Sequence, residues 1–207
     1  MKTSISRLAT ALLLTAGVFA APAAQASDKS DLLRDANRTI TELRHDPAFG
    51  TARTMLQNAR AVYIVPKLVK GGFIFGAEGG DGVLLKRSGH GWSDPKFYGM
   101  GSASFGLQAG LEQAELVFII NSDRALRGIE DGNFKIGGQG GITVANLSAG
   151  AEGATTLHGG DMVVWTSATG AYGGLSFNGT VIKADKDEGE PSPMQAAELE
   201  KNLSAVW

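Results

Sequence analysis

The chain has 207 residues, a formal net charge of −2 at pH 7 and no cysteine. The lack of cysteine excludes a disulfide framework, a thiolate nucleophile and a thiolate metal site. A nucleic-acid-binding protein usually has a basic patch and a high pI, so the acidic balance argues against that class.

Residues 1–26 have the pattern of a secretory signal peptide. Lys2 and Arg7 precede the apolar stretch 8–21, and Ala24-Gln25-Ala26 fits a small-x-small cleavage site. The alternative, a retained membrane anchor, is weaker because the apolar stretch is shorter than the roughly 20 residues that span a bilayer. No cysteine follows the stretch, which argues against a lipoprotein. We therefore expect an exported protein, periplasmic or associated with the cell envelope.

Two helices are predicted in the region 27–59. Between residues 27 and 44, apolar residues recur every three or four positions with charged residues between them, which is typical of an amphipathic helix. Asp46-Pro47 then offers an N-cap and a proline for the first turn of a second helix. The chain after the signal peptide therefore starts with two helices.

A glycine-rich β region is predicted over residues 60–183. The chain has 29 glycines, and all but Gly17, Gly50 and Gly189 fall between Gly71 and Gly179. A glycine within a strand usually marks a bulge, a bend or a close approach of another backbone. This composition predicts a strongly curved sheet.

The first strands of this region frame its densest glycine run. Residues 61–66 are expected to form a short strand that Pro66 ends. Residues 73–78 and 83–87 are expected to form a hairpin, because Gly79-Gly80-Asp81-Gly82 between them suits the positive φ angles of a turn. On that hairpin, Phe73 and Phe75 share parity and are expected to face the core.

The rest of the region completes an α+β fold. Residues 96–109 predict a long curved strand, and the continuously apolar 116–120 predicts a strand in the middle of the sheet, covered on both faces. A short helix over 124–129, capped by 121–123, is inserted before more strands. Those strands are expected at 134–141, 142–152, 162–166, 171–177 and 180–183. The fold class is therefore a barrel-like antiparallel sheet with two N-terminal helices and a short inserted helix.

The segment 184–207 differs in composition from the region before it. It begins as an acidic linker with two prolines and ends in residues 194–207, where Leu199, Leu203 and Trp207 would lie on one side of a short helix. We expect a solvated linker and a short terminal element.

A catalytic or cofactor site is not visible in the sequence. His45, His90 and His158 are isolated from one another, whereas zinc ligands usually come in pairs at short spacing. The glycine loops lack the lysine and hydroxyl residue that end a phosphate-binding loop. We expect no cofactor, no metal and no enzyme activity. An envelope hydrolase would need Ser102 or Ser176 beside a histidine and a carboxylate.

Basic and aromatic residues alternate between residues 60 and 98. Such a mixture suits the boundary of an anionic membrane, where aromatic rings sit at headgroup level. The candidates for phosphate contact are Lys67, Lys70, Lys86, Arg87 and Lys96, and those for the interface are Trp92, Phe97 and Tyr98. The alternative is that the aromatic residues are core and that the lysines are solvated residues that protect sheet edges.

Several motifs in this order resemble the SYLF domain family over about residues 50 to 183. They are Val65-Pro66, Lys70-Gly71-Gly72-Phe73, Gly76, Gly80-Asp81-Gly82-Val83-Leu84, Trp92-Ser93-Asp94-Pro95, Phe97, Gly106-Leu107-Gln108-Ala109-Gly110, Leu116-Val117, and Gly170 to Gly174 with Gly179. The resemblance implies binding of anionic phospholipids, which are phosphoinositides for the eukaryotic members, and actin association for the yeast members. It also implies membrane contact by an N-terminal amphipathic helix, which the segment 27–58 matches in position.

These observations lead to one main hypothesis and two alternatives. The main hypothesis is a non-catalytic, exported lipid-binding protein that associates with anionic phospholipid headgroups in the cell envelope. The first alternative is an envelope scaffold that binds a protein partner without lipid affinity. The second is the envelope hydrolase.

Overall fold

The computed structural model describes residues 21–72, 75–89, 91–105, 110–132, 134–136, 142–147, 160–167, 177, 179–186 and 189–205. Its helices are α1 (Ala21–His45), α2 (Phe49–Asn58), α3 (Asp123–Glu130) and α5 (Pro193–Ser204). Its strands are β1 (Ala61–Gly72), β2 (Phe75–Ser88), β3 (Gly91–Trp92), β4 (Lys96–Phe105), β5 (Gly110–Ile120), β6 (Phe134–Lys135), β7 (Val144–Asn146), β8 (Met162–Thr166) and β9 (Val181–Ala184).

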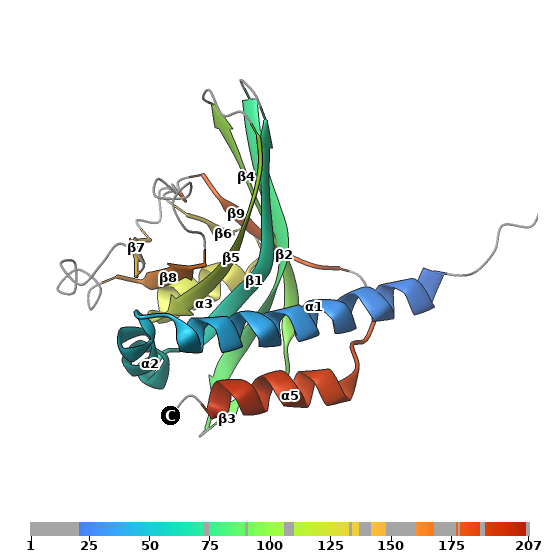
Figure 1. The fold of residues 1–207 in the computed structure, drawn as a ribbon, viewed down its shortest axis with the longest axis vertical. Coiled ribbons are helices and arrows are strands. Elements are labelled where there is room, and N and C mark those ends of the chain that lie inside the picture. The colour runs from blue at the N-terminus through green and yellow to red at the C-terminus, as the bar shows by residue number, and fades with distance from the viewer. Residues whose placement is uncertain are drawn as a thin grey trace, which may run out of the picture.

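The strands form one curled sheet with helices on both of its sides (Figure 1). The strand order is β6-β9-β4-β2-β1-β5-β8-β7, and β3 pairs with β2 at its end. This confirms the α+β class and the curved sheet. All pairs are antiparallel except β7 with β8. The chain between these two strands exceeds the dozen or so residues that a parallel crossover needs, so the sheet is mixed where a wholly antiparallel one was predicted.

Two apolar cores lie on opposite faces of the central strands. Val62 and Ile64 of β1 belong to the core that includes residues of α1, α2 and α5. Tyr63 and Val65 belong to the core that includes residues of α3. The apolar run 116–120 in β5 is fully buried between the two, with β1 on one side and β8 on the other. The prediction of a central, doubly covered strand is confirmed.

Strand β1 continues through Pro66, so the prediction that this proline ends the strand was wrong. The register of β1 shifts between Ile64 and Val69 against β2, and between Val65 and Leu68 against β5. An irregularity of this kind leaves an unpaired position, which a proline without an N–H group can occupy even in a central strand.

The hairpin turn is also not where the sequence placed it. Strand β2 runs without a break through residues 79–82, and the β1–β2 pairing extends to Gly72 opposite Gly76. The glycines with positive φ among the described residues are Gly89, Gly132 and Gly179. The glycines of residues 79–82 therefore do not form a turn. The side chains of Phe73 and Phe75, both expected to face the core, lie outside the described residues.

Close packing explains two of these glycines. A Cβ on Gly82 would lie 2.6 Å from Cε2 of Tyr63 and 2.7 Å from the carbonyl oxygen of Ile64. A Cβ on Gly80 would lie 2.4 Å from the carbonyl oxygen of Lys67. Gly79, on the opposite face of the same strand, would meet nothing closer than 3.5 Å. Alternate glycines of β2 are thus required on the face that packs against Tyr63.

The helices follow the sequence signals with small shifts. Helix α3 confirms the inserted helix, and the side chain of Ser122 caps it by accepting from the amide of Ala125. Helix α2 begins at Phe49, later than predicted, because the carboxylate of Asp46 accepts from the amide of Ala48 in a turn before the helix. Helix α1 covers the first predicted helix and begins at Ala21, before the predicted cleavage position.

The C-terminal segment folds back onto the domain as helix α5. Leu199 and Leu203 are fully buried in the same core as α1 residues, while the predicted third member of that face, Trp207, lies outside the described residues. The side chains of Asn37 and Asn202 are hydrogen bonded at 2.6 Å between the two helices. Helix α5 and α1 therefore form a two-helix layer beside the sheet (Figure 1).

Some predicted elements fall wholly or partly outside the description. The predicted strands 134–141 and 142–152 appear as the shorter β6 and β7, and residues 137–141 and 148–152 are not described. The predicted strand 180–183 appears as β9, shifted by one residue. The predicted strand 171–177 is described only at Phe177.

Candidate functional site

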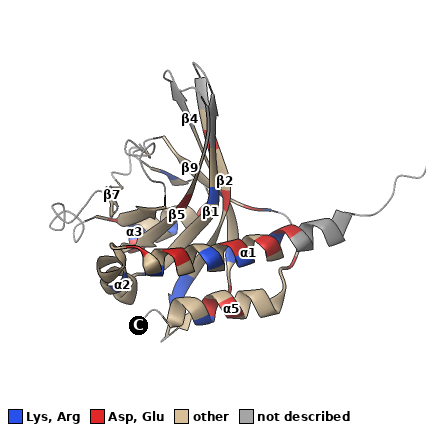
Figure 2. Cartoon of the chain, in the orientation of Figure 1, with Lys and Arg blue, Asp and Glu red and all other residues tan. Residues whose placement is uncertain are grey.

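The basic candidates divide between the two faces of the sheet. Lys86 points toward α3, where its ammonium lies 2.6 Å from a carboxylate oxygen of Glu130. The next residue, Arg87, points the opposite way and donates to the carbonyl oxygen of Leu56 in α2. Successive residues of a strand face opposite sides, so these two side chains cannot belong to one surface. Figure 2 likewise shows Lys and Arg on helices and strands alike, interleaved with Asp and Glu.

Lys96 lies on the α3 side, near Lys86. It is exposed at the start of β4 and pairs with Leu84, two residues before Lys86 on the neighbouring strand. Diagonal neighbours of this kind lie about 7–8 Å apart. The structure thus brings two of the predicted phosphate contacts together.

Lys186 joins this pair from a distant part of the sequence. Tyr98 pairs with Ala184, and the amide of Asp185 donates to the carbonyl of Phe97, so continuation of this register puts Lys186 opposite Lys96. Both lysines are exposed, and neither forms an ion pair with a described residue. We call Lys86, Lys96 and Lys186 the α3-side lysines. The position of Lys186, just after a predicted strand, could have indicated that it lies beside the sheet. Because acidic residues surround it, we predicted a solvated linker there instead.

Arg87 and Trp92 are part of the packed structure. The guanidinium lies 3.9 Å from the centre of the Trp92 ring, and burial lowers the pKa of Arg87. The Trp92 side chain is buried within the core on the α1 side. This pair links β2 and β3 to α2, so its geometry favours a structural role over contact with a membrane.

Tyr98 is likewise buried, in the core on the α3 side. Its backbone carbonyl accepts from the hydroxyl of Tyr63, and the two rings meet edge to face at 6.3 Å. Burial and the nearby Glu130 carboxylate raise the pKa of Tyr98. The burial of Tyr98 and Trp92 favours the alternative in which these aromatic residues are core.

Phe97 is half-buried on the α1 side of β4. The ammonium of Lys29 lies 5.1 Å from the centre of its ring and 3.5 Å from a carboxylate oxygen of Asp185. Lys29 is itself buried, so this cluster fixes the first turns of α1 to the end of β9. Phe97 is thus on the other side of the sheet from the α3-side lysines.

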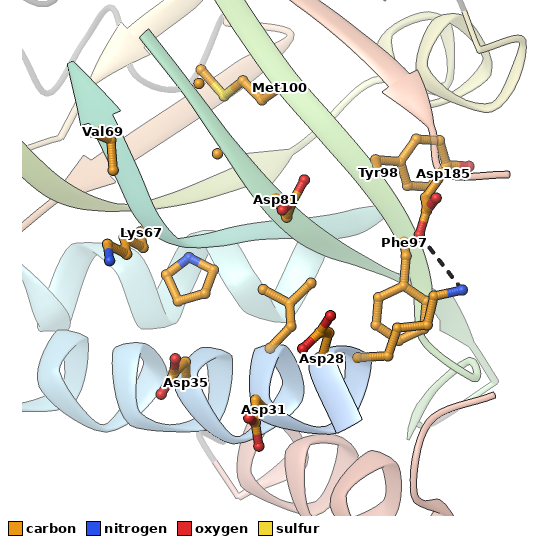
Figure 3. A pocket seen from close by; sticks show the side chains of 15 residues that line it. Asp28, Asp31, Asp35, Lys67, Val69, Asp81, Phe97, Tyr98, Met100 and Asp185 are labelled. Carbon is orange, nitrogen blue, oxygen red and sulfur yellow. Dashed lines mark ion pairs between the residues drawn. The ribbon is translucent and has the colours of Figure 1, made fainter. Parts of the chain in front are cut away.

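Lys67 lies at a cavity of about 710 Å³ between α1 and the sheet (Figure 3). Figure 3 shows carboxylates on both walls, from α1 and from Asp81 of β2. Its charged lining residues are Asp28, Asp31, Asp35, Asp81 and Asp185 against Lys29 and Lys67. An anionic headgroup would meet an excess of negative charge here. The cavity is therefore a poor site for phosphate, although Lys67 itself is exposed. The side chain of Lys70 lies outside the described residues.

The hydrolase constellation is not assembled among the described residues. The hydroxyl of Ser102 donates to Glu78 at 2.6 Å, but His45, the one described histidine, lies on α1, where its ring nitrogen contacts the carbonyl of Thr41. Ser176, His90 and His158 lie outside the description. Within the described ranges, no group of three or more histidine or acidic residues could hold a metal ion. In the same ranges, no helix has the length and apolar character needed to cross a bilayer.

Comparison with known proteins gives one family and several relatives. Residues 101–191 match the Ysc84 family, described as Las17-binding protein actin regulator. SH3 domain-containing YSC84-like protein 1 of Rattus norvegicus is 32% identical over 155 residues, covering 72% of this chain and 45% of the relative. Protein YSC84 of Saccharomyces cerevisiae is 28% identical over 163 residues, covering 74% of this chain and 35% of the relative.

A further relative carries a binding partner in its name. LAS seventeen-binding protein 3 of Saccharomyces cerevisiae is 26% identical over 163 residues, covering 74% of this chain and 35% of the relative. The chain spans less than half the length of the curated relatives it matches. No solved structure matches the chain significantly.

Proposed function

Since the chain carries a domain of the Ysc84 family, the SYLF domain, we propose that it is a non-catalytic, exported protein that binds anionic phospholipid headgroups in the cell envelope. Its relatives are named as binding or regulatory proteins. Export rests on the signal-peptide pattern of residues 1–26. The mass of the protein purified from a periplasmic extract tests that part. A mass corresponding to residues 27–207 supports export, and the full-length mass contradicts cleavage.

The observation that carries the proposed site is the pair of unneutralised lysines, Lys96 and Lys186. Lys96 begins β4 and Lys186 follows the end of β9, so their like charges would repel each other, and an anion between them would relieve that repulsion. Each basic residue near an anionic membrane surface contributes about 1 kcal/mol to binding. The acid-lined cavity on the α1 side offers no such attraction. The α3 side of the sheet is therefore the proposed membrane-facing side.

Charge reversal tests this placement. Lys96→Glu with Lys186→Glu is expected to weaken binding to anionic vesicles by at least about thirtyfold, since two contacts of about 1 kcal/mol each are lost and become repulsive. The matched control is Lys135→Glu with Lys183→Glu, which changes net charge equally at exposed positions of β6 and β9. Circular dichroism and urea unfolding verify that both variants fold. Equal losses in the two variants would show that net charge matters and that the proposed site does not.

A protein partner is the second candidate, because relatives are named as Las17-binding proteins. In the envelope this would be a scaffold without lipid affinity. Cross-linking of the exported protein in intact cells tests it. A stoichiometric partner recovered together with an absence of vesicle binding would favour the scaffold over the lipid-binding protein.

A further inference from the structure

A carboxylate is held at the contact between helix α1 and strand β5. Glu115 has the same parity as Val117 and Ile119, whose side chains lie in the core on the α1 side. The hydroxyl of Thr39, which is fully buried on α1, lies 3.1 Å from Oε1 of Glu115 and donates to it. Glu115 therefore faces the helix that covers its strand.

The second oxygen of this carboxylate lacks a donor. Oε2 of Glu115 is buried and has no hydrogen-bond partner among the described residues. Glu42 follows Thr39 by three positions on α1, so its side chain lies on the same side of the helix as the hydroxyl that contacts Glu115. Two ionised carboxylates are both acceptors, so they cannot bond to each other. A proton on either one creates an O–H···O bond that satisfies the buried oxygen.

The surrounding groups do not replace that proton. On α1, Nε of Arg38 lies 3.9 Å from Glu42, but its guanidinium is mostly exposed and also pairs with Asp35 at 3.1 Å. On the β8 side, the hydroxyl of Ser167 accepts from the backbone amide of Glu115 and does not contribute a hydrogen bond to the carboxylate. The irregularity of β1 opposite Glu115 contains Lys67, which is exposed at the neighbouring cavity.

The electrostatics agree with the geometry. Burial first, and then the hydrogen bond and charge of Glu42, raise the pKa of Glu115 to about 7, against the opposing effects of Thr39 and Arg38. The pair therefore still holds one proton at mildly acidic pH and loses it near neutrality.

We propose that Glu42 and Glu115 share one proton across the α1–β5 contact and so act as a pH-sensitive latch that holds helix α1 on the sheet. With the proton bound, the two side chains form a short bridge between helix and strand. When both carboxylates ionise, they repel each other beside a buried surface, and α1 loosens. The switch responds to the pH of the surrounding medium.

The latch controls a large apolar surface. Leu33, Ala36, Ile40 and Leu43 of α1 are at most 1% exposed and pack in one core with residues of β1, β5 and α5. The apolar face of α1 is therefore available to a membrane only after the helix leaves the sheet. This consequence rests on the proposed lipid-binding function, whereas the shared proton does not.

Hydrogen exchange of the α1 amides tests the latch directly. In the unaltered protein, protection corrected for intrinsic exchange is expected to fall by at least about tenfold between about pH 5.5 and about pH 8.5. Glu115→Gln supplies a permanent N–H donor and is expected to abolish the fall. Glu42→Gln supplies the N–H donor from the partly exposed side of the contact and is expected to have the same effect. It replaces Glu115→Gln in the test if that variant fails to fold.

Two control variants separate the pair from other groups. His45 is an ionisable residue of α1 outside the pair, so His45→Gln should retain the full pH dependence. Glu190→Gln changes an exposed glutamate and should also retain it. Carboxyl carbon NMR should show the Glu115 resonance titrating near neutrality, and at lower pH in Glu42→Gln, where burial still raises the pKa but Glu42 no longer does.

Protection of α1 that is equal at both pH values, or a Glu115 carboxyl that titrates below about pH 5, overturns the latch. The lipid proposal is judged by a separate measurement, namely vesicle binding at one fixed pH. A latch without vesicle binding, or vesicle binding without a latch, therefore identifies which of the two fails.

Discussion

Substitution of Gly82 by alanine tests the close packing that shapes the sheet. The new methyl group would lie 2.6 Å from the Tyr63 ring and 2.7 Å from the carbonyl oxygen of Ile64. Carbon atoms in good contact are about 3.5–4.0 Å apart, so the neighbours must move by about 1 Å. Because no glycine in residues 79–82 has a positive φ, the cost arises from packing and not from backbone conformation.

The magnitude follows from how firmly those neighbours are held. Tyr63 is fully buried, its ring is 6.0 Å from that of Phe118, and its hydroxyl is hydrogen bonded to the carbonyl of Tyr98. Ile64 contributes backbone in the middle of the sheet, which moves less easily than a side chain. Overpacking of a core costs about 1–3 kcal/mol. We expect Gly82→Ala to lower the free energy of unfolding by about 3 kcal/mol, at the upper end of that range.

Urea unfolding measures this effect, with Gly79→Ala as the matched control. Gly79 lies on the same strand, but its added methyl would be 3.5 Å from the carbonyl of Met100, an ordinary contact. The control is expected to be neutral or to stabilise by about 0.5 kcal/mol, because alanine restricts the unfolded chain. The midpoint for Gly82→Ala should fall by about 1 M or more. Equal midpoints for the two variants would refute close packing as the reason for Gly82.

Three further substitutions address the C-terminal helix, an aspartate and a stacked arginine. Leu203→Ala in α5 should lower the free energy of unfolding in urea by about 2–5 kcal/mol, because this side chain is fully buried. The control Met194→Ala, at a residue 78% exposed, should change it by less than about 0.5 kcal/mol. Equal effects of the two substitutions would mean that α5 does not pack on α1. Burial raises the pKa of Asp161, but hydrogen bonds from a hydroxyl, a backbone amide and a guanidinium outweigh it and lower the pKa to about 2. Asp161→Asn should therefore lower the free energy of unfolding by about 2 kcal/mol at neutral pH. The difference in stability between the two proteins should shrink as pH falls from 3.8 toward about 2, where the native aspartate protonates. A stability difference that is independent of pH would contradict this. Arg87→Lys should lose about 1 kcal/mol and shift the fluorescence of Trp92, since lysine cannot both stack on that ring and bond the α2 carbonyl; an unchanged spectrum would contradict the stacking.

Local signals predicted the elements whose causes are local. The hydroxyl of Ser122 stands one residue before α3 and caps it, as the sequence indicates. The continuous apolar run 116–120 predicted a central strand because only burial on both faces tolerates it. The amphipathic pattern of α5, with Leu199 and Leu203 on one side, likewise predicted a helix, although its packing against α1 requires the tertiary structure.

The errors arose where distant residues decide the outcome. A glycine run between two apolar segments is typical of a turn. Only the position of Tyr63 on the neighbouring strand β1 reveals that Gly82 is needed for close packing. The division of Lys86 and Arg87 between two faces could have been predicted from the sequence, since the side chains of adjacent strand residues point to opposite faces. The position of Lys186 beside Lys96 could not have been predicted in this way, because it depends on the pairing of β4 with a strand far along the chain.

Sedimentation of the purified protein, residues 27–207, with vesicles tests the proposed function most directly. Two vesicle preparations are compared at equal total lipid and low salt, one containing only zwitterionic phosphatidylcholine and one in which about a third of it is replaced by anionic phosphatidylglycerol. Binding of anionic headgroups by exposed lysines predicts that the protein pellets with the anionic vesicles and returns to the supernatant at high salt. Equal recovery in the supernatant with both preparations would contradict it.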